Sequence, residues 1–144
     1  MDTSQIRIQL LGQHADLRAL IEQTRVTATR PRQGWPPDAG DDLAARVVRL
    51  ARALKAHNAC EEELLKGLLA TVDAWGPARA EIMHERHHAE HEDLHSELLD
   101  ASFDPGRVGH LLDRLLEHMA YEEQAFLNED VLREDSIVIN AFGG

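Results

Sequence analysis

The sequence predicts an all-α protein that folds as an up-down-up-down antiparallel four-helix bundle, and three observations indicate this. The chain has 144 residues, which suits one domain with one core. Hydrophobic residues make up 43% of it and aromatic residues only 4%, a composition that favours helices over strands. Apolar residues recur at alternating steps of four and three in four segments, which are separated by residues that break helices.

The first two segments are joined by a long loop. The first runs from about residue 4 to residue 30, where three prolines and two glycines within residues 31–40 end it. The second begins at Asp41 or Asp42, because Asp is a favourable N-cap. The expected inner stripes are Leu10, His14, Leu17, Ile21 and Thr24 in the first segment, and Leu43, Val47, Leu50, Leu54, His57, Glu61, Leu64 and Leu68 in the second.

The third and fourth segments each have a proline at their start. Pro77 suits the first turn of the third segment, which covers about residues 78–101. Asp104 caps the fourth segment, which Pro105 opens and which ends near Leu132. The expected stripes are Ala80, His84, His87, His91, Leu94 and Leu98, then Val108, Leu111, Leu115, His118, Glu122 and Ala125. We assign residues 1–132 to the bundle and residues 133–144 to a C-terminal tail.

Polar residues interrupt all four apolar stripes near the middle of each segment. They are His14, His57, Glu61, His87, His91, His118 and Glu122. Burying one unpaired polar group costs roughly 2–7 kcal/mol, so seven at a similar depth must satisfy one another. A metal does this most directly, since His is the commonest protein metal ligand and carboxylates can bridge two ions. The sequence therefore predicts a metal centre in the core.

Spacing along the helices decides which histidines belong to this centre. His57 and Glu61, like His118 and Glu122, are four residues apart and therefore share one helix face. In the third segment, which has five histidines, the angles around the helix axis select His87 and His91. The others are His84, a second-layer residue or alternative ligand, and His88 and His95, which we expect at the surface or its boundary.

The order of these motifs resembles the hemerythrin-like, or HHE cation-binding, domain of the bacterial type, over nearly the whole chain. The resemblance implies two iron ions with oxo and carboxylate bridges, in which Glu61 and Glu122 are the bridging carboxylates. It implies that His87, His91 and His118 cap one ion, and that His14 and His57 cap the other, which keeps an open position. O2, NO or peroxide would bind there, in oxygen binding or sensing or in an oxidative-stress response.

Several alternatives stay open beside this resemblance. Zinc can substitute for iron, because imidazole and carboxylate accept both metals. A ferritin-like iron oxidase or storage protein is suggested by two ExxH motifs that end at His88 and His95, although His14 stands where that family needs a core glutamate. A metal-free helical interaction module is the third alternative. The chain ends its fourth segment with HxxxE, whereas animal oxygen carriers have HxxxxD, which leaves a ligand binder, a sensor and a peroxide- or NO-processing enzyme all open.

The remaining features concern location and partners. A net charge of −11 argues against nucleic acid as a partner. Cys60 is the only cysteine, which excludes an internal disulfide and favours a cytoplasmic protein, and neither a signal peptide nor a membrane-spanning stretch is visible. Residues 137–142 in the tail are apolar, so we expect them to pack over the bundle end or to dock onto a partner or a second subunit. Tyr121 either hydrogen-bonds at the site or packs, and Cys60 either tunes the site or fills space.

Overall fold

The computed structural model describes residues 2–30, 39–72, 76–125 and 127. Within these ranges the chain forms four α-helices and no strands: α1 (Thr3–Ala28), α2 (Ala39–Val72), α3 (Gly76–Asp100) and α4 (Pro105–Ala125). The prediction of an all-α protein with four helices is therefore confirmed. The expected end of the fourth helix near Leu132 and the tail of residues 133–144, with its docking or packing role, lie outside the described residues.

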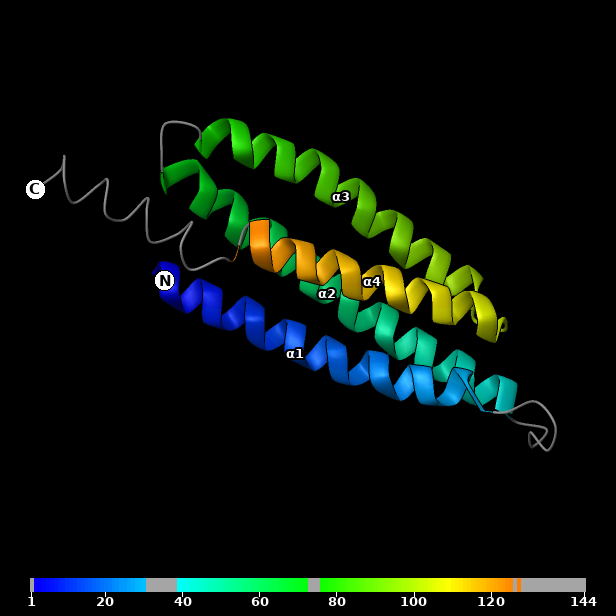
Figure 1. Cartoon of the computed structure of the whole chain (residues 1–144). Helices are drawn as coiled ribbons and strands as arrows, with labels where there is room; N and C mark the ends of the chain where they lie inside the picture. Colours follow the sequence, from blue (N-terminus) through cyan, green and yellow to red (C-terminus); the bar gives the residue numbers. More distant parts are fainter. Residues whose placement is uncertain (1, 31–38, 73–75, 126, 128–144) are drawn as a thin grey trace, which may run out of the picture.

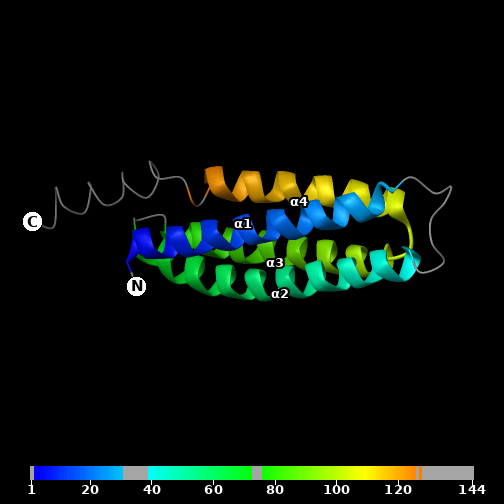
Figure 2. The same ribbon diagram turned by 90° about the horizontal axis from the view of Figure 1, so that it is seen from below.

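The four helices lie side by side along one long axis (Figures 1 and 2). Helix α1 packs against α2 and α4, and α3 packs against the same two helices. These contacts are compatible with the predicted antiparallel bundle. None of the described helices is long and apolar enough to cross a membrane.

The core between the helices consists mainly of leucines. Its largest fully buried side chains are Leu10, Leu17, Ile21, Leu43, Leu50, Leu54, Leu65, Leu98, Leu112 and Leu115. Each such side chain contributes about 1.5–3 kcal/mol to folding through the removal of its apolar surface from water. The core surrounds the middle of the bundle, where the polar residues lie, so those residues are held at fixed positions by close-packed neighbours.

The helix ends are set by short capping motifs. At α1, the backbone N–H of Gln5 donates to the Asp2 carboxylate at 2.8 Å, and the Gln5 side chain accepts from the backbone N–H of Asp2 at 2.8 Å. At α4, the backbone N–H of Arg107 donates to Asp104 at 3.1 Å, which confirms the predicted cap. The predicted cap of α2 was wrong, because the helix begins at Ala39 and Asp42 lies inside it, paired with Arg30 at 3.5 Å.

Two stripe predictions were also wrong. In α2, Leu65 is fully buried whereas Leu64 is only half-buried. A stripe with a strict seven-residue repeat drifts by about 20° per heptad on a straight helix, so three heptads after Leu43 the next residue faces the core. In α3, His84 is exposed, and no described residue of this helix before His87 is buried. The helix angle that places His84 in the stripe therefore does not decide whether its side chain is buried.

Candidate metal centre

All seven polar residues predicted for the metal centre meet in the middle of the bundle. Six of them are buried, and the His118 side chain is 8% exposed. They form two sets of four donor atoms, each set lying within 4.8 Å, and the two sets share Glu122. The first set is His87, His91, His118 and Glu122, and the second set is His14, His57, Glu61 and Glu122. Helix α1 supplies one residue and each of the other helices supplies two.

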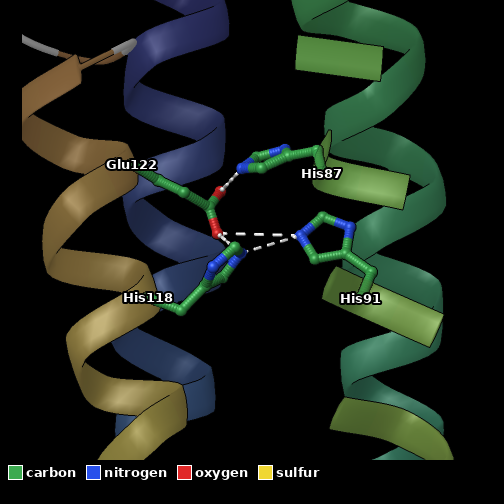
Figure 3. Close-up of side chains that lie close together, drawn as sticks. All are labelled: His87, His91, His118 and Glu122. Carbon is green, nitrogen blue, oxygen red and sulfur yellow. Dashed lines mark hydrogen bonds and ion pairs between the residues drawn. The ribbon is translucent and has the colours of Figure 1, made fainter. Parts of the chain in front are cut away.

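The first set brings nitrogen and oxygen acceptors together between α3 and α4 (Figure 3). His118 Nε2 lies 2.6 Å from Glu122 Oε1 and 3.1 Å from His91 Nε2. His91 Nε2 lies 3.7 Å from the same Glu122 oxygen, and His87 Nε2 lies 3.5 Å from Oε2 of this carboxyl group. The two oxygens of Glu122 thus face imidazoles from α3 and from its own helix.

The second set lies between α1 and α2, on the other side of Glu122. His57 Nε2 and His14 Nε2 lie 3.0 Å and 3.3 Å from the same oxygen of Glu61. His14 Nε2 is also 3.8 Å from Glu122 Oε2, so it faces both carboxyl groups. The His57 Nε2, Glu61 Oε1 and Glu122 Oε2 atoms are buried and form no hydrogen bond with the described residues. Buried polar atoms of this kind are uncommon in native proteins and call for a partner.

A second layer of acceptors holds the outer nitrogens of the imidazoles. His57 Nδ1 lies 2.7 Å from the side-chain oxygen of Gln13, and His118 Nδ1 lies 3.0 Å from the Glu90 carboxylate. Because an amide oxygen and a carboxylate only accept, these Nδ1 atoms carry the ring protons. The Nε2 atoms of both rings therefore present lone pairs to the centre, which is the tautomer that a metal requires.

Two further carboxylates lie behind the other imidazoles. His91 Nδ1 is 3.2 Å from Glu62, which fixes the same tautomer in this ring. His14 Nδ1 lies 3.7 Å from Glu123, and Arg18 holds that carboxylate by donating to it at 2.9 Å. The layer therefore supports these four imidazoles, and it consists of side chains that are half-buried or exposed.

The second layer repeats between the two halves of the chain. Gln13 precedes His14 as Glu90 precedes His91, and each accepts from the histidine of the following helix. Glu62 follows Glu61 as Glu123 follows Glu122. These four residues were not among the site residues predicted from the sequence. Both motifs read HxxxEE, with a second glutamate directly after the core glutamate. This repeat was the signal that could have identified Glu62 and Glu123.

The two core carboxyl groups titrate as one pair. Burial alone would raise the pKa of Glu61, but the close contacts of its carboxyl group with Glu122, His14 and His57 outweigh burial and hold that pKa well below 4.5. Burial, the hydrogen bond to Glu61 and the charge of Glu61 raise the pKa of Glu122 well above 4.5. In the protein without metal, Glu61 is therefore ionised, and Glu122 carries the proton and donates it.

Burial also keeps the imidazoles of α3 and α4 neutral. It lowers the pKa of His87 to about 4, and burial together with the neighbouring His87 lowers that of His91 to about 3. Burial lowers the pKa of His118 as well, against the charge of Glu90. At neutral pH these three rings are therefore unprotonated, which leaves them ready to bind a cation without first losing a proton.

The remaining residues singled out in the sequence lie outside the donor sets. His88 is 56% exposed, with His84 stacked on it at a ring distance of 6.0 Å, and His95 is half-buried, so the surface or boundary placement of His88 and His95 is confirmed. Cys60 is half-buried and accepts from the amide of Gln13 at 3.4 Å, which links it to the second layer. Tyr121 is 59% exposed and lines a groove beside His118.

Comparison of the chain with models of protein families, with curated proteins and with solved structures finds no match. The buried clusters of His and Glu could hold a metal ion on their geometry alone.

Proposed function

We propose that this protein is a hemerythrin-like, up-down-up-down four-helix bundle that holds two iron ions and binds O2, NO or peroxide at an open coordination position. The direction of the colour gradient reverses from each helix to the next in Figure 1, which supports the antiparallel arrangement. The seven donors that meet at one level of the bundle, six of them buried, support the metal centre. The function would be in oxygen binding or sensing or in a response to oxidants.

The observation that carries the proposal is the meeting of lone pairs in the first donor set. The Nε2 atoms of His91 and His118 face each other at 3.1 Å, and their ring protons are directed outward to Glu62 and Glu90. Glu122 Oε1 faces the same point, and the proton of Glu122 can satisfy only one acceptor. Two acceptors that face each other repel, whereas a cation between them satisfies both. The donors present therefore fit a metal ion.

The number of ions follows from the sharing of donors. Each set has four donor atoms, and Glu122, which belongs to both, has two oxygens directed to different imidazoles. This supports two ions, which Glu122 would join. Glu61, whose Oε1 lies 3.3 Å from His87 Nδ1, would be the second bridging carboxylate, and the five imidazoles would be terminal ligands. Imidazole and carboxylate donors suit iron, with zinc as a substitute, and four donors leave open positions on an ion that takes five or six. When bound, the iron pair supplies these open positions and redox change.

The protein side chains perform three tasks in this centre. The second layer orients the imidazoles, since Gln13, Glu62 and Glu90 fix the tautomers of three rings. The buried leucines of the core cover the donors at one end of the centre and limit the access of water from that side. Glu122 gives up its proton when a cation binds, because a bridging carboxylate must be ionised.

Metal analysis tests the proposal. Protein reconstituted with Fe(II) without oxygen should hold two ions per chain, and Glu122→Ala should lower this number, whereas His88→Ala should retain it. A visible absorption band that appears when air is admitted and vanishes on purging would indicate reversible oxygen binding. A band that persists would indicate oxidation, and thus sensing or redox work.

Other outcomes would favour the alternatives. A chain that binds no iron or zinc and whose stability is unchanged by a chelator would be a metal-free interaction module. Turnover of many iron atoms per chain would instead indicate a ferritin-like oxidase. The donor composition speaks against the latter, because helix α1 contributes His14 to the centre and no glutamate.

A further inference from the structure

Two histidines lie one turn apart on the exposed side of α3. His84 and His88 are the two ends of a His-Glu-Arg-His-His run, so their side chains share one helix face. Both are exposed, His88 by 56%, and their rings stack with centroids 6.0 Å apart and planes inclined by 23°. Neither belongs to the donor sets of the core. This histidine pair therefore offers ring nitrogens at the surface that the proposed function does not use.

A carboxylate from α2 lies behind one ring of the pair. His88 Nδ1 is 3.4 Å from Glu62 Oε1. A carboxylate has no proton to donate, so this contact favours the ring proton on Nδ1 and leaves a lone pair on Nε2. The same oxygen of Glu62 is 3.2 Å from Nδ1 of the buried His91, where it favours the same tautomer. Glu62 thus supports one imidazole of the core and a second imidazole at the surface.

This arrangement has the components of a metal site. Histidines at positions i and i+4 of a helix can bind one ion through a nitrogen of each ring, at about 2.0–2.1 Å for zinc. Both side chains are exposed, so rotation about their side-chain bonds can bring the two nitrogens to one ion. A carboxylate behind a ligating imidazole is the usual support for such a ring. The remaining positions on the ion would be open to water.

The charges near the pair favour a cation. Exposed glutamates stand three residues before His84, at Glu81, and four residues after His88, at Glu92, and so on the same side of α3. His88 and Glu92 also line a pocket of about 170 Å³ between α2 and α3, in which Lys55 is the opposing charge. The carboxylates therefore stand on both sides of the pair along the helix, and the lysine stands only beside His88.

We propose that His84 and His88 form a second metal site, at the surface of α3, which takes a divalent transition ion of the zinc class. Imidazole suits zinc, copper and nickel, and these ions bind nitrogen ligands more tightly than ferrous iron does. The inference does not rest on the proposed function, because neither ligand belongs to the core centre. Since Glu62 contacts both His88 and His91, a single carboxylate would separate the surface ion from the core donors.

Equilibrium dialysis of the full chain against Zn(II) tests the inference. The unmodified chain should hold one more zinc ion than either His84→Ala or His88→Ala, because neither imidazole alone can chelate. For the same reason, the double variant should bind no less zinc than each single variant. Glu62→Ala should weaken the additional ion about tenfold, since it removes the support of His88. The matched control is His110→Ala, an exposed histidine of α4 with no second imidazole one turn away, which should keep the full zinc content.

Equal zinc content in the unmodified chain, His84→Ala and His88→Ala would overturn the inference. Additive losses from the two single variants, or an equal loss in His110→Ala, would also overturn it, because each surface imidazole would then bind separately. Iron content distinguishes this site from the core. His88→Ala should lose the zinc ion and keep the iron, whereas loss of both would place His88 in the core centre and defeat the inference. A chain that takes up no iron but shows the zinc difference would defeat the proposed function alone.

Discussion

Replacing Glu122 with Gln should make the metal-free protein more stable at alkaline pH while it weakens metal binding. In the metal-free centre Glu122 is protonated beside the ionised carboxylate of Glu61. The amide of Gln can donate in the same place and carries no proton to lose. A residue kept as a metal ligand is therefore expected to reduce the stability of the protein when no metal is bound.

The pH dependence of the free energy of unfolding follows from the upward shift of the Glu122 pKa. A group whose folded-state pKa lies above its unfolded value of 4.5 stabilises the fold fully below pH 4.5, and this contribution is lost as pH rises towards the folded pKa. The free energy of unfolding should fall by about 1.4 kcal/mol per pH unit in that window. His87 and His91 have the opposite sign, because their pKa values are lowered to about 4 and about 3; their contribution is lost as pH falls below 6.5 and is nearly constant above pH 7.

Urea unfolding in the presence of a chelator, at a series of pH values from 4.5 upward, measures this difference. The slope of unfolding free energy against pH should be more negative in the unmodified protein than in Glu122→Gln, by about 1.4 kcal/mol per pH unit between pH 4.5 and the folded-state pKa of Glu122. The matched control is Glu117→Gln, an exposed carboxylate on the same helix, which should retain the slope of the unmodified protein. Equal slopes in the unmodified protein and in Glu122→Gln would refute the shared proton and the reasoning from burial.

Three further predictions concern ligands, support and packing. His87→Ala should empty the metal site and His88→Ala should not, as measured by metal analysis; the reverse would show that the register of α3 is wrong. Glu90→Ala should lower metal affinity by about 10–100-fold without unfolding the protein, because it removes the acceptor behind His118, and competition with a chelator would measure this. Leu115→Ala should lower the free energy of unfolding by about 2–5 kcal/mol, since its side chain is fully buried in the core; urea unfolding with a change below 1 kcal/mol would contradict that placement.

Much of the fold could be predicted from the sequence because helical periodicity decides which side chains are buried. The seven donors were identifiable for the same reason, since polar residues in an apolar stripe are conspicuous. The error at Leu64 arose because a fixed seven-residue step drifts on a straight helix, and the error at His84 arose because periodicity gives an angle around the helix but not the burial of the side chain. The start of α2 was wrongly placed at Asp41 or Asp42 because a favourable N-cap residue type does not by itself decide where a helix begins.

The second layer and the groove could not be predicted in this way. Gln13 and Glu90 occupy the half-buried and exposed edges of their helices, where polar residues are ordinary, and only the packing of neighbouring helices brings them to an imidazole. The groove beside His118 depends on how closely α3 and α4 approach each other. Spacing within one helix carries no information on that distance.

The repeat of the second layer between the two halves of the chain has one exception, and it concerns charge. Behind His118 stands the carboxylate of Glu90, whereas behind the corresponding His57 stands the neutral amide of Gln13. A carboxylate behind an imidazole makes it a stronger electron donor than an amide does. Two ions in this centre would therefore not be equivalent: the ion at the His118 end should be taken up first and released last, so that the centre fills in order.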